Sequence, residues 1–222
     1  MTRVEAEGIA ALWEDLLQRT PLPPRVGGVT GAEYELARLV QAHPVRIIET
    51  PAAKTWIWSD LHLRDPGAFE SSSRPFPNLH AMEARMLEAW HNNVGADDTI
   101  VCLGDVAHPN AFDDQDLVKQ LRACPGRRVL VVGNHDLGCQ RPLEEAGFRD
   151  QCAAALCASD PPAALTHLPL ARLPYGAVHL YGHLHARGDR APRRRDVGVD
   201  AIGFAPRRLD WLLEDLAADS SD

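Results

Sequence analysis

Short apolar runs that end in acidic, amide or imidazole side chains recur along this chain and constrain its fold more than any other feature. The clearest run is VLVVGNHD at 129–136, where four aliphatic residues and a glycine precede Asn134, His135 and Asp136. Such a run predicts a short buried strand that stops at a tight turn. Open α/β sheets hold their functional groups at the carboxyl ends of such strands. We therefore expect an α/β fold with a site at one sheet edge.

Six strand-like runs and six helical patterns organise the chain. The strand-like runs cover 45–50, 55–63, 99–108, 128–136, 163–169 and 177–186. Apolar residues at helical spacing predict helices near 8–19, 31–42, 78–93, 113–123, 142–147 and 207–218. The first 52 residues carry no cluster of ligand-type side chains, so we interpret 1–52 as an N-terminal helical extension packed on a main domain at 53–222.

Composition limits the class of protein. A chain of 222 residues that is 45% hydrophobic can bury a sizeable core in one domain. Its net charge of −8 argues against broad attraction to nucleic acid or anionic membranes. Five cysteines without a CxxC pair favour reduced thiols. Since no apolar run approaches the roughly 20 residues of a membrane span, we expect a cytoplasmic protein with no membrane partner.

Seven side chains at the predicted strand ends are candidate metal ligands. In DLH at 60–62 and HLH at 183–185, the outer residues are two apart, so an extended backbone directs both to the same side. The full set is Asp60, His62, Asp105, Asn134, His167, His183 and His185.

This ligand set exceeds the needs of a single ion. Imidazole with carboxylate suits a borderline divalent metal, whereas magnesium or calcium would draw mainly oxygen ligands. A two-metal site with ions about 3.5–4 Å apart and one bridging carboxylate would use all seven groups and leave room for a hydroxide. We expect two divalent ions, manganese first, with iron, zinc, nickel and cobalt as alternatives.

The order of five blocks, D-x-H, G-D, G-N-H-D, H and G-H-x-H, resembles the calcineurin-like metallophosphoesterases. The resemblance covers residues 55 to about 212. The segments RPFPNLHAMEARMLEAWHNNVGADDTIVCLGD and DVGVDAIGFAPRRLDWL are similar to a small bacterial and phage branch of predicted phosphoesterases. The resemblance implies an α/β fold in which two mixed β-sheets form a sandwich flanked by helices, with 53–222 as the metallophosphoesterase domain.

The resemblance also implies roles for single residues. Asp60, His62 and His185 would hold one ion, Asn134, His167 and His183 the other, and Asp105 would bridge them. His135 would be a catalytic residue that faces the substrate, where it stabilises developing charge or protonates the leaving oxygen. Asp136 would orient it. The reaction would be in-line attack by a metal-bridging hydroxide on phosphorus.

Several arginines are candidates for contact with a substrate. Arg74, on a serine-rich loop, could bind phosphate oxygens, with a solvated loop arginine as the alternative. The segment 187–195 is either a flexible basic flap beside the metals or a solvated loop; its arginines are Arg187, Arg190, Arg193, Arg194 and Arg195. Arg64 and Asp65 stand where similar sequences carry Gly-His.

The sequence thus predicts a dinuclear metal-dependent phosphoesterase that hydrolyses phosphodiester or phosphomonoester bonds. Small nucleotides or cyclic phosphodiesters are the favoured substrates, because the chain is short and lacks an extensive basic surface. One alternative is a nuclease acting on DNA or RNA ends, and another is a non-catalytic protein-interaction scaffold. No oligomeric state is predicted.

Overall fold

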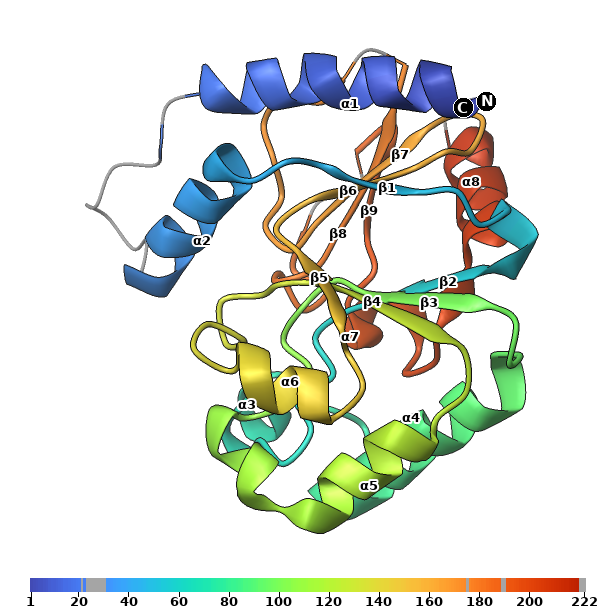
Figure 1. Cartoon of the computed structure of the whole chain (residues 1–222). Coiled ribbons are helices and arrows are strands. Elements are labelled where there is room, and N and C mark those ends of the chain that lie inside the picture. The colour runs from blue at the N-terminus through green and yellow to red at the C-terminus, as the bar shows by residue number, and fades with distance from the viewer. Residues whose placement is uncertain (21, 23–30, 175, 189–190, 220–222) are drawn as a thin grey trace.

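Two five-stranded sheets lie face to face in the computed structural model, which describes residues 1–20, 22, 31–174, 176–188 and 191–219 (Figure 1). The first sheet has the order β1-β6-β7-β8-β9, with β1 at Arg46–Ile48, β6 at Ala155–Cys157, β7 at Ala163–Thr166, β8 at Val178–Tyr181 and β9 at Arg194–Asp196. The second has the order β10-β2-β3-β4-β5, with β10 at Arg207–Arg208, β2 at Thr55–Trp58, β3 at Thr99–Cys102, β4 at Arg127–Val131 and β5 at Asp150–Cys152.

Both sheets are mixed, as the family resemblance implied. In the first, only the β6–β7 pair is antiparallel, and in the second only the β10–β2 pair. The helices are α1 at Arg3–Gln18, α2 at Gly31–Ala42, α3 at Pro66–Ser71, α4 at Leu79–Asn93, α5 at Gln115–Ala123, α6 at Gln140–Glu145, α7 at Val199–Ile202 and α8 at Leu209–Ala218. Helix α1 covers the first sheet, and α4 and α5 lie beyond the second (Figure 1). The expected helix-flanked sandwich is confirmed.

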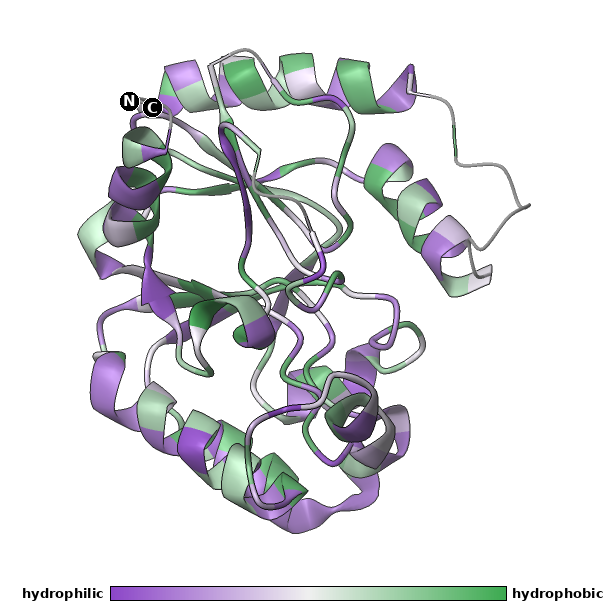
Figure 2. Cartoon of the chain, turned by 180° about the vertical axis from the view of Figure 1, so that it is seen from behind, coloured by the Kyte–Doolittle hydropathy of each residue, from purple (hydrophilic) through white to green (hydrophobic). Residues whose placement is uncertain are grey.

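Helix α1 forms on a regular apolar stripe. Ala6, Ala10, Trp13 and Leu17 recur at helical spacing, and all four are buried. Trp13 belongs to a cluster with Leu156 and other residues of the first sheet. Thr2 and Glu5 form a capping box at the start of the helix. In Figure 2 the outer helices alternate between hydrophobic and hydrophilic residues, as expected for helices that cover a sheet on one side.

The expected extension at 1–52 contains a strand of the sandwich. Arg46–Ile48 pairs in parallel with Ala155–Cys157, so β1 forms one edge of the first sheet. Helix α1 and strand β1 therefore both pack on the region at 53–222. The division at residue 52 itself stays a prediction.

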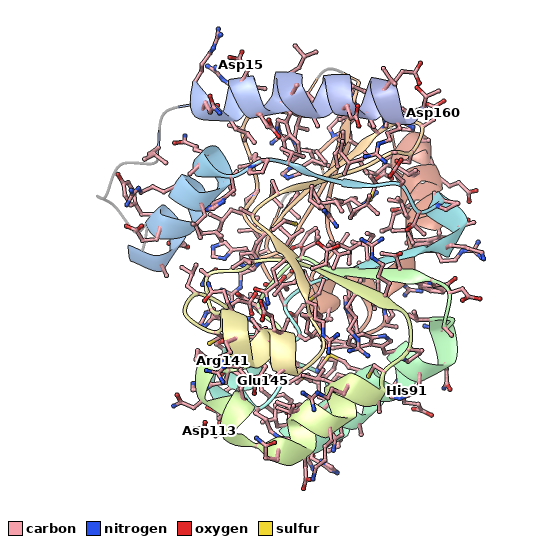
Figure 3. The ribbon with its side chains drawn as sticks, viewed as in Figure 1. Asp15, His91, Asp113, Arg141, Glu145 and Asp160 are labelled. Carbon is pink, nitrogen blue, oxygen red and sulfur yellow. The ribbon has the colours of Figure 1, made fainter. Side chains whose placement is uncertain are left out.

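Charged side chains gather on the outside of the sandwich. Asp15 and Asp160 point outward beside α1, and Arg141 and Glu145 of α6 point outward on the opposite side, where they form an ion pair of 3.2 Å (Figure 3). Among the described residues, none of the helices combines the length and the apolar character that a membrane crossing requires.

Candidate metal centre

The carboxyl ends of five strands meet at one edge of the sandwich and carry the predicted ligands. Asp60, Asp105 and Asn134 follow β2, β3 and β4, which pair in parallel in the second sheet. His167 and His183 follow β7 and β8, a parallel pair of the first sheet. Because parallel strands end at the same edge, each sheet delivers its polar loop residues to one place.

The structure brings all seven predicted ligands together around Asp105. Oδ2 of Asp105 lies 3.3 Å from Nε2 of His167 and 3.6 Å from Nε2 of His62. Nε2 of His185 lies 3.9 Å from Oδ1 of Asp60. Among the described residues, candidate ligand atoms fall within 4.8 Å of one another in three groups. Two share Asp60, namely Asp60, His62 and His185, and Asp60, Asp105 and His167; the third is His62, Asp65 and His135.

The amide of Asn134 joins the remaining histidine to this cluster. Its Oδ1 lies 2.9 Å from Nε2 of His167 and 3.0 Å from Nδ1 of His183. Asp60 also contacts the same loop, because both of its carboxylate oxygens accept the backbone N–H of His183 at 3.0 Å. The cluster therefore spans the two sheets without a gap.

Each of the four imidazoles has one nitrogen paired on the side away from the cluster. Nδ1 of His62 lies 3.0 Å from Asp65, and Nδ1 of His185 lies 2.8 Å from Asp200. Nδ1 of His167 lies 2.7 Å from the carbonyl oxygen of Leu103, and Nε2 of His183 lies 2.8 Å from Glu33. An acceptor at the outer nitrogen fixes the proton there and leaves the inner nitrogen as a lone-pair donor.

The chemistry of this donor set fits divalent cations. Nε2 of His62 is buried and has no hydrogen-bond partner, which is costly unless another group satisfies it. Four inward nitrogens, two carboxylates and an amide oxygen form the nitrogen and oxygen environment that such ions take. These residues therefore form a candidate metal centre.

The carboxylates of the cluster favour the protonated form of one imidazole. Burial lowers the pKa of His167, but the carboxylates of Asp105 and Asp60 outweigh that effect and raise it to about 10. Burial raises the pKa of Asp105, but His167 and His62 outweigh it and keep the value below the ordinary range. A cation would take the place of this proton, so we expect metal uptake to release protons.

The backbone at the centre is strained. Positive φ is uncommon for residues other than glycine, and it costs about 1–3 kcal/mol where the surroundings enforce it. Five of the seven predicted ligands adopt it: Asp60, His62, Asp105, His183 and His185. Such strain clusters at functional sites, which favours a functional role for these loops.

Glycines allow the loops to approach each other closely. A Cβ on Gly133 would lie 2.2 Å from Oδ1 of Asp105, and a Cβ on Gly182 would lie 2.1 Å from Oγ of Ser59. These contacts explain why glycine precedes Asn134 and His183.

The two predicted catalytic residues lie in different surroundings. The side chain of His135 is exposed, and its ring centroid lies 5.0 Å from that of His62, which places it beside the centre. The expectation that Asp136 orients His135 is wrong. Its buried carboxylate accepts backbone N–H groups of Gly133, Asp105 and Val106, so it holds two loops in place.

The structure also corrects the expectation for Arg74, whose guanidinium is buried and paired within the protein. It forms two hydrogen bonds of 3.0 Å with Asp200 and donates to the carbonyl oxygens of Asp60 and Leu61. Because the guanidinium of Arg74 is buried and these groups occupy it, it is neither free to bind a phosphate nor exposed to solvent as a loop arginine would be. Arg74 instead fixes Asp200, which in turn contacts His185.

The predicted basic flap is partly built into the fold. Arg194 and Arg195 begin β9, and Arg195 is buried against Asp215 and Asp219 of the C-terminal segment. Arg193 donates to the carbonyl oxygen of Ala177. Arg187 is exposed and reaches the carbonyl oxygen of Ser71, while Arg190 lies outside the described residues.

Sequence reasoning missed three carboxylates that contact the predicted ligands. Asp65 was noted only as a departure from similar sequences, next to Arg64, which pairs with Glu83 and Asp114. Asp200 lies in the segment DVGVDAIGFAPRRLDWL, on which part of the family resemblance depends, so the resemblance of this segment could have indicated a functional role for Asp200. Glu33 lies in α2, where no local pattern points to a site.

The comparisons with known proteins concern the family and the fold. A family model described as calcineurin-like phosphoesterase matches residues 53–167. The gene 66 protein of Mycobacterium phage L5 is 31% identical over 84 residues, which is 38% of this chain and 40% of that protein. The gene 66 protein of Mycobacterium phage D29 is 27% identical over 188 residues, with 67% of this chain and 89% of that protein covered.

A solved structure has a similar fold. A protein of unknown function from Aquifex aeolicus matches 71% of this chain and 98% of its own length, with a TM-score of 0.57 and 20% sequence identity. At this identity the similarity concerns the fold alone.

Proposed function

Because this chain belongs to the calcineurin-like phosphoesterase family, we propose that its metal centre hydrolyses phosphodiester or phosphomonoester bonds of nucleotide-like substrates. The protein is a metal-dependent phosphoesterase. The observation that carries the proposal is the set of four imidazoles, each paired on its outer nitrogen and each directing the other nitrogen toward the cluster of Asp60, Asp105 and Asn134.

The proposed centre holds two divalent cations, with manganese as the first candidate. Asp60, His62 and His185 would form one site and Asn134, His167 and His183 the other. Asp105 would bridge the two, which its nearly equal distances from His62 and His167 support. When bound, the cations would lower the pKa of a water molecule and neutralise charge on the phosphate group.

The side chains of the protein would orient the substrate and move the proton. His135 is exposed beside His62, so its imidazole could reach a phosphate oxygen or donate a proton to the leaving oxygen. Its backbone N–H donates to Oδ1 of Asp105 at 2.9 Å, which ties its position to the centre. Asp136 would act indirectly, by holding the loops of Asp105 and Gly133 together.

A substrate screen tests the proposal. Purified protein with added manganese should cleave nitrophenyl monoesters or bis-esters and a subset of nucleotides and cyclic phosphodiesters, and a chelator should abolish the activity. The variant Asp105→Ala should lose the activity as well. Turnover that survives both treatments would contradict the proposed centre. No turnover of any ester would favour the interaction scaffold.

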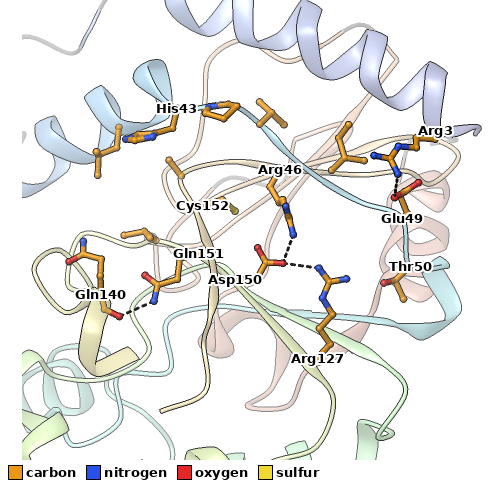
Figure 4. A pocket seen from close by; sticks show the side chains of 16 residues that line it. Arg3, His43, Arg46, Glu49, Thr50, Arg127, Gln140, Asp150, Gln151 and Cys152 are labelled. Atoms are coloured by element: carbon orange, nitrogen blue, oxygen red, sulfur yellow. Dashed lines mark hydrogen bonds and ion pairs between the residues drawn. The ribbon is translucent and has the colours of Figure 1, made fainter. Parts of the chain in front are cut away.

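A cavity of about 780 Å³ favours the nuclease as a second candidate function. It runs between the edge strands of the two sheets, β1 and β5 (Figure 4). Arg46 and Arg127 both contact Oδ2 of Asp150 at 2.7 Å, so two guanidinium groups share one carboxylate. Val132 and Gln140, which flank the Asn134 loop in sequence, also line the cavity. A nucleic-acid strand could follow this groove away from the centre.

Salt dependence distinguishes the two substrate classes. A strand bound along Arg46 and Arg127 would release counterions, so the logarithm of its affinity should fall with the logarithm of salt at a slope of about −0.7 per phosphate contacted. A small nucleotide should show a shallow response. Charge-removing variants Arg46→Gln and Arg127→Gln should reduce the slope only if the groove binds a strand.

The cellular location that we propose is the cytoplasm. The five cysteines are free thiols in the structure, which supports a reducing environment.

A further inference from the structure

Helix α2 of the N-terminal segment reaches the candidate metal centre through one acidic side chain. Oε1 of Glu33 lies 2.8 Å from Nε2 of His183, and both side chains are about one-fifth exposed, at 19% and 22%. The contact links two positions 150 residues apart in the sequence. It is therefore a consequence of how α2 packs on the sandwich.

The packing of α2 explains why Glu33 points to the centre. Leu36 is fully buried in the main core, and Val40 is buried in the cluster beneath α1. Residues three and seven positions apart lie on the same side of a helix, so the face that buries Leu36 and Val40 also presents Glu33. Glu35 belongs to a different face and forms an ion pair of 3.1 Å with Arg38.

Two oxygen acceptors compete for the single proton of a neutral His183. Nε2 faces the carboxylate of Glu33, and Nδ1 faces Oδ1 of Asn134 at 3.0 Å. A carboxylate is a stronger acceptor than an amide, so the proton belongs on Nε2. Nδ1 then directs its lone pair toward the side of the cluster.

We propose that Glu33 is a positioning residue of the metal centre, which fixes the tautomer of His183 so that Nδ1 can bind a cation. This inference rests on the proposed dinuclear function. Asp65, Asp200 and the carbonyl of Leu103 contact the other three imidazoles in the same way. Helix α2 thus completes the centre, and the N-terminal segment becomes part of the catalytic apparatus.

Metal-binding measurements on the full chain test this proposal. Glu33→Ala should weaken manganese binding at one of two sites by about 10–100-fold, as is typical when an outer carboxylate partner of a metal-binding histidine is lost. Glu33→Gln should lose less, because its amide oxygen can still accept the proton. Glu35→Ala is the matched control on the same helix and should bind both ions as the wild type does.

A nitrogen NMR measurement separates positioning from a purely structural role. In the metal-free wild type, the signal that His183→Gln removes should be that of a neutral imidazole protonated on Nε2, and Glu33→Ala should shift it toward a mixture of tautomers. If Glu33→Ala binds manganese as the wild type does and leaves the His183 signal unchanged, the positioning role of Glu33 is overturned, whereas the dinuclear function is not. A wild type that binds fewer than two manganese ions would overturn the dinuclear function and this inference with it.

Discussion

At the scale of single residues, the loop after β4 places adjacent side chains in two different environments. Asn134 is half-buried and contacts His167 and His183, whereas His135 is exposed. The backbone N–H of His135 donates to Asp105, so the exposed imidazole is held beside the centre. We therefore expect that a substitution of His135 can lower turnover without changing metal binding.

The variant His135→Ala should therefore retain its metal and lose turnover. We expect kcat to fall by about 10²–10⁴-fold if the imidazole acts as a general acid. Metal content per chain should equal that of the wild type, because the backbone hydrogen bond to Asp105 persists. Kinetics and elemental analysis on the same preparation provide the check, and a metal-depleted variant would reassign His135 to the ligands.

The buried histidine of β8 packs within the first sheet. His179 in β8 is fully buried, and its Nε2 lies 2.8 Å from Oγ1 of Thr166 in the neighbouring strand. Burial, with a smaller contribution from Arg194, lowers the pKa of His179 to about 3. The folded protein therefore keeps this imidazole neutral at pH values where the unfolded chain protonates it.

This shift predicts that stability decreases in acid. The contribution of His179 is fully present above the ordinary histidine pKa of about 6.5, and it is lost as the pH falls from there toward 3, by about 1.4 kcal/mol per pH unit. Urea unfolding at pH 7 and pH 5 should show a smaller difference for His179→Gln than for the wild type. The exposed His43→Gln should retain the wild-type difference. Equal pH dependence in all three proteins would contradict the shift.

At the scale of elements, the centre depends on the contact between loops of opposite sheets. Gly182 follows β8, and a Cβ there would lie 2.1 Å from Oγ of Ser59 and 2.4 Å from Oδ2 of Asp60. Ser59 and Asp60 follow β2 in the other sheet. A methyl group at this point would separate the two loops.

The variant Gly182→Ala should consequently be destabilised by about 1–3 kcal/mol, the usual cost of overpacking. It should also bind manganese more weakly, because the added atom displaces Asp60. Gly8→Ala is the control, since a Cβ in that exposed part of α1 meets nothing within 4 Å and alanine favours a helix by about 0.5–1 kcal/mol. Denaturant titrations with and without manganese measure both effects. A Gly182 variant as stable as Gly8→Ala would contradict the close contact.

Most helices and strands of the fold could be predicted from the sequence. All six expected helices and six expected strand runs form, because each has apolar periodicity or a clear polar end. Strands β5, β6 and β9 contain three residues each and β10 contains two, and none of the expected strand runs covers them. Strand β1 is equally short, but it lies in the expected run 45–50. The seven predicted ligands converge because they end strands. Glu33 and the buried environment of Arg74 depend on tertiary packing, which no local pattern records.

At the scale of the whole molecule, the candidate centre joins the two sheets. Asp60, His62, Asp105 and Asn134 come from loops of the second sheet, and His167, His183 and His185 come from loops of the first. Cations bound among them would connect both halves of the sandwich. Since the unfolded chain scatters these groups, cations should bind the folded state preferentially.

Metal removal should therefore lower global stability. For one site with free manganese at 100 times its Kd, the expected loss on chelation is about 2.7 kcal/mol of unfolding free energy. Asp105→Ala should show little response to manganese or chelator, because it removes the carboxylate that we propose bridges the two ions. Unfolding transitions recorded at several manganese concentrations measure the dependence. A wild-type midpoint that stays constant across this range would mean that the seven side chains do not bind the ion, however close together the fold places them.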